Sequence, residues 1–180
     1  MPAQPKTICH VFKLRLETWP FPLWVGLAAS PGGLRRVVIE SDRLSARAAL
    51  KDVLGDSRLS WTPLTQYAEF FRRYAWGEAR ALAAIKVDLS GMSAFRRRVL
   101  RRVRGIAFGR TRSYGEVAAT VGSPRAARAV GTAMAKNPLP LVVPCHRVLG
   151  GAGRLGGYSA CGGTALKKAL LMHERWSVTS

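Results

Sequence analysis

Residues 113–136 read SYGEVAATVGSPRAARAVGTAMAK, and this stretch predicts two helices joined by a tight turn. Ser113 and Glu116 have the spacing of a capping box, in which the hydroxyl and the carboxylate accept hydrogen bonds from backbone N–H groups at the start of a helix. We expect the first helix to run to Val121, because Gly122 favours the backbone conformation that ends a helix.

The second helix is predicted to begin at Ser123 and to continue to about Lys136. Ser123 is a suitable N-cap, and Pro124 fits the first helical position, where its missing N–H costs nothing. A helix, a Gly turn and a second helix are typical of a helix-turn-helix. Short helix pairs also occur in structural cores, so this pattern alone does not decide between DNA binding and packing.

A basic amphipathic helix is expected just before this stretch, from Ser93 onward. Apolar residues recur there at helical spacing, and the opposite face carries arginines: Phe95, Val99, Leu100, Val103 and Ile106 against Arg96, Arg97, Arg98, Arg101, Arg102 and Arg104. A solvated face normally mixes signs, but no acidic residue lies between Asp88 and Glu116. We therefore favour phosphate contact over a solvated face or a membrane-surface helix.

The charge of the chain is concentrated in its second half. The 180 residues include 29 Lys and Arg but 10 Asp and Glu, a net charge of +19. Residues 1–88 carry a net charge of +5 and residues 89–180 a net charge of +14. We expect an N-terminal scaffold domain over 1–88 and a C-terminal DNA-binding and active-site domain over 89–180. The excess predicts a polyanionic partner or an anionic membrane surface, and the ordinary share of hydrophobic residues argues against wholesale disorder.

The first half has the pattern of a small α+β scaffold. Residues 8–40 form short apolar or alternating runs separated by Pro and Gly, which predict two or three β-strands. Helical patterns follow over Leu44 to Leu54 and over Leu64 to Trp76. We attribute the aromatic residues at helical spacing in the second pattern to core packing: Tyr67, Phe70, Phe71 and Tyr74.

The second helix of the 113–136 pair is rich in small side chains, which let a backbone approach a DNA groove closely. It lacks an Asn or Gln near its start to read bases, so we expect little sequence-specific recognition. Arg128 is the one long residue among the small ones. It either enters the base stack or contacts a phosphate.

An apolar segment after Asn137 leads to Cys145-His146-Arg147. A free Cys is usually an inert buried residue, but Pro on one side and His-Arg on the other favour a nucleophile with a stabilised thiolate. His146 is the candidate base, directly or through a water, and such a base needs an orienting partner. Glu174 is the candidate partner, because Glu116 is used by its capping box; the alternative is an exposed C-terminal Glu.

The three cysteines form no CxxC pair and are odd in number, which argues against a disulfide framework and against a zinc site. We expect no metal and no cofactor. The uncharged stretch from Thr18 to Leu34 contains three prolines and does not resemble a membrane-spanning helix. With no signal peptide pattern, we expect a cytoplasmic protein that does not bind membranes and is a monomer.

These motifs resemble the O6-alkylguanine-DNA alkyltransferase family. The resemblance is carried by Asn137-Pro, by Pro144-Cys-His-Arg-Val148, by Gly156-Gly-Tyr-Ser159 and by Ala169-Leu-Leu with Glu174, together with Tyr74-Ala-Trp-Gly77, Val87-Asp-Leu-Ser-Gly91 and Ser113-Tyr114. It is firm over residues 64–176 and weak before them. It implies a ribonuclease-H-like N-terminal domain and a mainly helical C-terminal domain that contains the helix-turn-helix and the reactive cysteine.

The resemblance also implies a role for each matching residue. Cys145 accepts the alkyl group, His146 deprotonates it through a water, and Glu174 orients His146. The residues implied to hold the substrate guanine are Tyr114, Val148, Tyr158, Ser159 and Asn137, of which Asn137 also ties the helix pair to the active-site segment. The residues predicted to bind DNA are Ser113, Ala126, Ala127, Arg128, Ala129, Gly131, Thr132 and Arg147, with Arg128 filling the space of a flipped nucleotide.

The chain departs from the family pattern at two places. Ile106-Ala-Phe-Gly109 replaces the familiar Ile-Pro-Tyr-Gly, and Ala160-Cys-Gly-Gly163 follows Ser159 where relatives have glycines and a shorter loop. Ala160 is expected to add a methyl group near the pocket, where it bears on the range of alkyl groups accepted.

Three functions remain to be weighed. The favoured one is a DNA repair protein that flips O6-alkylguanine out of duplex DNA and transfers the alkyl group irreversibly to its own Cys145. The alternative is a DNA-lesion-binding module without transfer, which lacks the reactive cysteine; Cys145 favours transfer. A helix-turn-helix transcription regulator is disfavoured, because base-reading side chains and a sensor element are not evident.

Overall fold

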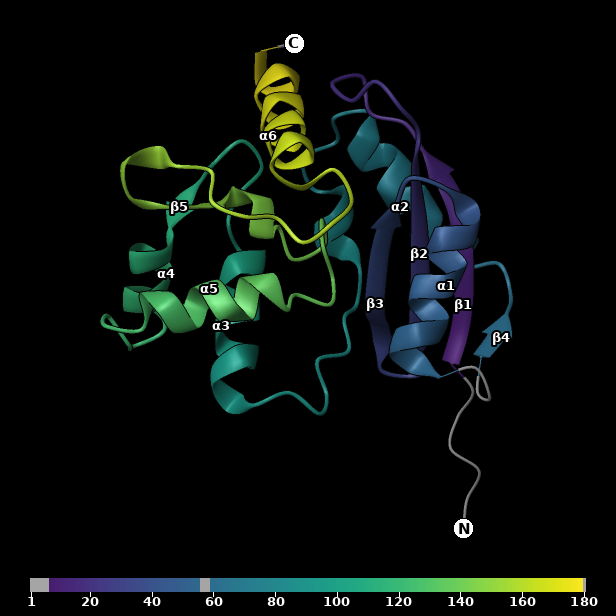
Figure 1. The fold of residues 1–180 in the computed structure, drawn as a ribbon, viewed down its shortest axis with the longest axis horizontal. Coiled ribbons are helices and arrows are strands. Elements are labelled where there is room, and N and C mark those ends of the chain that lie inside the picture. Colours follow the sequence, from purple (N-terminus) through teal and green to yellow (C-terminus); the bar gives the residue numbers. More distant parts are fainter. Residues whose placement is uncertain (1–6, 56–58, 180) are drawn as a thin grey trace.

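The computed structural model describes residues 7–55 and 59–179 and has a mixed α+β fold (Figure 1). The first half forms a sheet with the strand order β3-β2-β1-β4. Its strands are β1 (Thr7–Leu14), β2 (Leu23–Ser30), β3 (Gly33–Glu40) and β4 (Leu59–Trp61). β2 is antiparallel to both β1 and β3, whereas β4 is parallel to β1. The strands expected within residues 8–40 are confirmed, and β4 was not predicted.

Helices α1 (Arg43–Leu54) and α2 (Thr65–Ala75) pack against opposite faces of this sheet. Side chains alternate between the two faces of a strand, so Cys9 of β1 packs with Leu50 of α1, while Phe12 packs with Phe71 of α2. Both helical patterns of the first half are therefore confirmed, and the aromatic residues of α2 do belong to the core.

The second half is mainly helical. A 3-10 turn (Ala81–Ala84) ends the first half. The elements of the second half are α3 (Ala94–Arg104), β5 (Arg112–Ser113), α4 (Tyr114–Thr120), α5 (Ala127–Ala135), a 3-10 turn (Cys145–Arg147), β6 (Val148–Leu149), a 3-10 turn (Gly151–Gly153) and α6 (Gly163–Thr179). The short strands β5 and β6 are parallel and join the start of α4 to the end of the cysteine segment.

The predicted start of α4 is confirmed, and the predicted start of α5 is wrong. The Ser113 hydroxyl accepts from the Glu116 amide at 3.1 Å, and the Glu116 carboxylate accepts from the Ser113 amide at 2.7 Å, which completes the capping box. Ser123 does not cap α5. The Ala126 amide instead donates to the Ser123 carbonyl at 2.8 Å, so residues 123–126 form a turn and α5 begins at Ala127. Pro124 fits the second position of such a turn as well as it fits a helix start.

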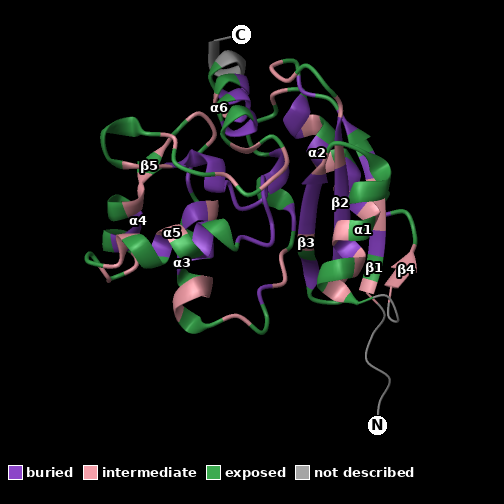
Figure 2. Cartoon of the chain, viewed as in Figure 1, coloured by how far each residue is buried: buried purple, intermediate pink, exposed green. Residues whose placement is uncertain are grey.

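The edge strand β3 joins the two halves of the molecule. The edge of β3 that has no neighbouring strand forms backbone hydrogen bonds with segments outside the sheet: Leu34 N to Lys86 O at 2.9 Å, Asp88 N to Leu34 O at 2.8 Å, Val37 N to Pro138 O at 2.8 Å and Cys161 N to Ile39 O at 3.3 Å. One hydrophobic cluster continues from the sheet through α3, α5 and α6. In Figure 2 the buried colour extends from β3 into the segment that contains Cys145. The division at residue 88 remains a prediction.

Candidate active site

Cys145 lies at the end of a buried segment that enters the middle of the molecule. All residues from Asn137 to Val148 are buried, and the Cys145 side chain retains 5% exposure. Leu141 has a left-handed backbone (φ 70°), which is strained for a side chain with a Cβ and shapes this segment. The sulfur borders a cavity of about 290 Å³, whose other lining residues are Tyr114, Gly131, Met134, Ala135, Gly157, Tyr158 and Ser159.

Asn137 holds the cysteine segment in its shape and contacts the sulfur directly. Its side-chain amide donates to the Val143 carbonyl at 2.8 Å and to Cys145 Sγ at 3.2 Å, and its oxygen accepts from the Leu139 amide at 3.0 Å. Burial raises the pKa of the Cys145 thiol, and the Asn137 hydrogen bond and the positive charge of Lys167 oppose this increase. Asn137 therefore combines a structural contact with stabilisation of a thiolate.

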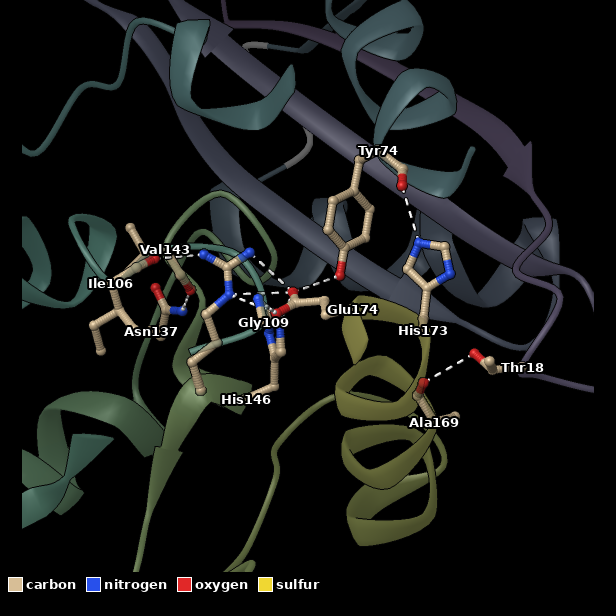
Figure 3. A network of polar contacts seen from close by, with 11 residues as sticks. Thr18, Tyr74, Ile106, Gly109, Asn137, Val143, His146, Ala169, His173 and Glu174 are labelled. Atoms are coloured by element: carbon tan, nitrogen blue, oxygen red, sulfur yellow. Dashed lines mark hydrogen bonds and ion pairs between the residues drawn. The ribbon is translucent and has the colours of Figure 1, made fainter. Parts of the chain in front are cut away.

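His146 and Glu174 form a buried pair. His146 Nε2 lies 2.6 Å from Glu174 Oε1, and both side chains are almost inaccessible (Figure 3). Because the carboxylate is an acceptor, this contact assigns the imidazole proton to Nε2. His146 Nδ1 is buried with no hydrogen-bond partner in the described structure, so it is a free acceptor. Burial also lowers the pKa of His146 and favours its neutral form, which is the form that can accept a proton.

The Glu174 carboxylate accepts hydrogen bonds from three further groups. Arg147 Nε donates to Oε2 at 2.8 Å, the Tyr74 hydroxyl donates to Oε1 at 2.9 Å, and the Gly109 amide donates to Oε2 at 3.2 Å. Burial alone would raise the pKa of Glu174, but His146 and Arg147 together lower it to about 2. Glu174 is thus a fully buried acceptor that is ionised at neutral pH.

The position of Arg147 is inconsistent with its predicted contact with DNA. Its guanidinium is buried, donates to both Glu174 oxygens, and donates to the Ile106 carbonyl at 2.6 Å. A phosphate contact would break this ion pair and leave the Glu174 charge buried and unpaired, which is costly. Arg147 is therefore a structural partner of Glu174, and its assignment to DNA binding needs correction.

Lys167 is a buried cation that the sequence did not single out. Its ammonium donates to the Val148 carbonyl at 2.9 Å and to the Leu155 carbonyl. Burial lowers the pKa of Lys167, and the nearby Cys145 raises it. Lys167 thereby fixes the carbonyl of Val148, a residue predicted to hold the substrate guanine, and it places a positive charge near the sulfur.

Two tyrosines and an exposed serine form the walls of the cavity at Cys145. Burial raises the pKa of the Tyr114 hydroxyl, and proximity to Cys145 raises it further. The Tyr158 hydroxyl is buried with no hydrogen-bond partner in the described structure, and Ser159 is exposed. Ala160 lines a neighbouring cleft, so its methyl group lies outside the lining of the Cys145 cavity.

The predicted DNA-binding residues of α5 lie at or near the surface. Arg128, Ala129 and Thr132 are exposed, and Ala126, Ala127 and Gly131 are half-buried. The Thr132 hydroxyl donates to the Arg128 carbonyl at 3.2 Å, while the Arg128 side chain has no partner among the described residues. Ser113 is the cap of α4.

Known proteins that resemble this chain are methylated-DNA–protein-cysteine methyltransferases, in agreement with the site at Cys145. Residues 94–176 match the family model described as the DNA-binding domain of 6-O-methylguanine DNA methyltransferase. A methylated-DNA–protein-cysteine methyltransferase of Mycolicibacterium paratuberculosis is 41% identical over 150 residues, which cover 81% of this chain and 88% of the relative. The chain belongs to the methylated-DNA–protein-cysteine methyltransferase family. The protein of the same name from Mus musculus is 41% identical over 131 residues, 70% of this chain and 62% of that protein.

Solved structures of this methyltransferase family have the same fold. Mycobacterium tuberculosis OGT in complex with DNA is 31% identical and has a TM-score of 0.73, with 94% of each chain covered. The O6-methylguanine-DNA methyltransferase of the hyperthermophilic archaeon Pyrococcus kodakaraensis is 28% identical and has a TM-score of 0.74, with 92% of this chain and 98% of that chain covered. Across the described residues of this family member, no cluster of potential metal ligands was found, and no helix is long and apolar enough to cross a membrane.

The structure also adds residues to the site that sequence reasoning missed. Tyr74 was assigned to core packing, and its ring does lie in the core, edge-on to Phe108 and His173. Its hydroxyl nevertheless reaches Glu174, which lies 100 residues away. The hydroxyl of a buried tyrosine needs a hydrogen-bond partner, so the sequence could have indicated that Tyr74 has a buried polar contact.

We predict that the free energy of unfolding of Glu174→Gln falls less steeply on acidification than that of the unmutated protein. The folded carboxyl has a pKa of about 2 against an ordinary value of 4.5, so its stabilisation is complete above about pH 4.5 and is lost as the pH falls towards 2. The shift corresponds to on the order of 3 kcal/mol in the free energy of unfolding. Urea denaturation at several pH values between about 6 and 3 measures it.

The variant should be less stable than the unmutated protein at neutral pH, with a smaller decline on acidification. Glu69→Gln is the control, because Glu69 is an exposed partner of Arg72 and should leave the pH curve unchanged. Parallel pH curves for Glu174→Gln and the unmutated protein would contradict the assignment of the low pKa to Glu174.

Proposed function

We propose that this protein repairs O6-alkylguanine in duplex DNA by transferring the alkyl group to Cys145. The observation that carries the proposal is the Cys145 sulfur at a cavity of about 290 Å³, with Asn137 hydrogen-bonded to it and the buried His146–Glu174 pair next to it in the chain. The cavity is at the lower end of the range for small-ligand pockets, which suits a single base. Membership of the methylated-DNA–protein-cysteine methyltransferase family supports the same reaction.

The reaction is a displacement at the alkyl carbon. The Cys145 proton passes through a water to His146 Nδ1, the unpaired ring nitrogen, and the thiolate attacks the alkyl carbon. A sulfur–carbon bond forms as the carbon–O6 bond breaks, and the electron pair of that bond leaves with the guanine. The Tyr114 hydroxyl is a donor at the cavity wall that supplies a hydrogen bond to the departing base, and Ser159 faces O6 through its backbone N–H.

Glu174 keeps the His146 proton on Nε2 and stabilises the imidazolium that forms during proton transfer. Asn137 stabilises the thiolate, and the carbonyls of Cys145 and Val148 accept from the guanine amino group. Lys167 holds the second of these carbonyls in place. Tyr158 completes the pocket wall. No step of this mechanism requires a cofactor.

DNA is bound by the α4–α5 pair, which we propose is a helix-turn-helix. Its capping box, the small exposed residues of α5 and the net charge of +14 over residues 89–180 support this assignment. The residues of this pair that contact the DNA are Ser113, Ala126, Ala127, Ala129, Gly131 and Thr132, and the small ones let α5 approach a groove closely. The four-stranded sheet over 1–88 then acts as a ribonuclease-H-like scaffold for a C-terminal functional domain over 89–180, and the protein acts as a monomer.

We predict that each molecule reacts once and that the alkyl group is found on Cys145. A thioether is stable, and the mechanism includes no group that hydrolyses or reduces it. Intact-mass measurement after mixing with excess methylated duplex should show one added methyl group, which peptide mapping should place on Cys145. Cys145→Ser should bind the DNA without gaining mass, and Cys161→Ser should react normally. Repeated turnover, or binding of the lesion without any transfer, would contradict the proposal; the second result would indicate a lesion-binding module.

We predict that Arg128 supports the flipped state of the DNA. Its side chain is exposed near the start of α5 among alanines, so it can occupy the space of an extruded nucleotide. Arg128→Ala should slow the reaction with duplex DNA by about tenfold or more, since unstacking a base costs a few kcal/mol, and should leave the reaction with free O6-methylguanine base nearly unchanged. Arg125→Ala, which removes an exposed arginine from the turn before α5, is the matched control. Equal losses on duplex and free base would show that Arg128 has no part in flipping.

A further inference from the structure

A second cavity lies beside the one at Cys145, between the two halves of the molecule. It has a volume of about 420 Å³ and is lined by Arg36 of β3, by Arg96 of α3 and by Lys136, which follows α5. Ala135 and Ser159 line both this cleft and the Cys145 cavity, so the two are adjacent. In Figure 1 the C-terminal end of α5 points towards β3 across this region.

A β-bulge determines which way Arg36 faces. The pairing of β2 with β3 runs from Ala28 opposite Arg36 to Ala29 opposite Leu34, which leaves Arg35 without a partner strand residue. The extra residue shifts the alternation of the strand, so Arg36 is half-buried while Arg35 is exposed. The Val37 amide, one residue further on, donates to the Pro138 carbonyl and fixes this part of β3 against the active-site segment.

Arg36 and Arg96 are like charges without a neutralising partner. The Nε atoms of both are buried and have no hydrogen-bond partner among the described residues, and no carboxylate there lies within ion-pair distance of either side chain. Arg96 is held in place by a hydrogen bond from its guanidinium to the Lys136 carbonyl. Burial lowers the pKa of Arg36, and the positive charge of Arg96 lowers it further.

The acidic residues of the cleft do not neutralise this pair. Glu40 lies four residues beyond Arg36 on β3, or about 13 Å along an extended strand, and Asp52 lies on α1. Burial and the neighbouring Asp42 raise the pKa of Glu40, and no arginine contributes to its shift. The positive charge is therefore concentrated at the end of the cleft formed by β3, α3 and the end of α5.

We propose that Arg36 and Arg96 bind one backbone phosphate of the DNA strand, next to the nucleotide that enters the Cys145 cavity. This inference rests on the proposed function, because it takes DNA as the ligand. Two guanidinium groups from opposite walls of a cleft provide the planar donors that phosphate oxygens accept well, and an anion between them removes their mutual repulsion. The N-terminal sheet thereby contributes directly to DNA binding.

The position of the cleft favours DNA over a free anion. Successive nucleotides rise by about 3.4 Å per strand, so a base held in the Cys145 cavity has its neighbouring phosphates within reach of an adjoining cleft. Lys136 adds a further positive charge at the same edge.

The test is the salt dependence of duplex binding by Arg36→Gln. Fluorescence anisotropy with a short unmodified duplex between about 50 and 200 mM salt should show binding about tenfold weaker and a slope of log affinity against log salt reduced by about 0.9, the value for one phosphate. Arg35→Gln is the matched control, since it removes the same charge from the adjacent, exposed position and should change the slope much less.

Two further measurements distinguish loss of the phosphate contact from damage to the active site or to the fold. Arg36→Gln should react with free O6-methylguanine base at the unmutated rate, because that reaction does not involve the phosphate. Its melting temperature should not fall, because the substitution removes a repulsion. An unchanged slope, a loss equal to that of Arg35→Gln, or weaker binding together with a lower melting temperature would overturn the phosphate site. Failure of the unmutated protein to alkylate Cys145 would instead refute the proposed function.

Discussion

The active site depends on one buried carboxylate. Glu174 of α6 accepts hydrogen bonds from His146 and Arg147 of the cysteine segment, from Tyr74 of α2 and from the Gly109 amide before α4. An ionised carboxylate is expensive to bury, and this one is stable because several donors surround it. Three regions of the chain are thereby fixed relative to one another at the point where proton transfer requires a defined geometry.

The same carboxylate explains why the scaffold and the reactive half are packed so closely. The Tyr74 hydroxyl contributes the contact from the N-terminal half, and His173 Nε2 donates to the Tyr74 carbonyl at 3.0 Å, which attaches α6 to the end of α2. The edge of β3 adds the hydrogen bond from Val37 to Pro138. The sheet therefore packs against the cysteine segment and holds it in place. In our proposal, Arg36 of the same sheet also contacts the DNA.

Local patterns in the sequence predicted local structure well. The capping box of Ser113 and Glu116 predicted the start of α4, because both partners lie within one turn of helix. The start of α5 was wrong, since Ser123-Pro124 satisfies the chemistry of a helix start and of a turn equally, and packing decides between them. The apolar runs over residues 8–40 predicted two or three strands, and the structure has three there, whereas β4 has three residues and is too short to leave a pattern.

The contacts of the site were less predictable. Pairing of His146 with Glu174 was expected and lies in the structure at 2.6 Å, but the partners of Glu174 from outside the cysteine segment depend on tertiary packing across many residues. Arg147 was predicted to bind DNA, but it pairs with the buried Glu174, and a basic sequence does not reveal which of its arginines is buried. Lys167 was not singled out from the sequence, and its full burial depends on tertiary packing.

In the proposed mechanism, Glu174 holds the proton of a neutral His146 on Nε2 and leaves Nδ1 free as the base. Nitrogen-15 chemical shifts of the imidazole ring, assigned by comparison with His146→Gln, measure this directly. We expect a protonated Nε2 and an unprotonated Nδ1 at neutral pH, with the Nε2 shift changed in Glu174→Gln. A proton on Nδ1, or a doubly protonated ring at neutral pH, would contradict it.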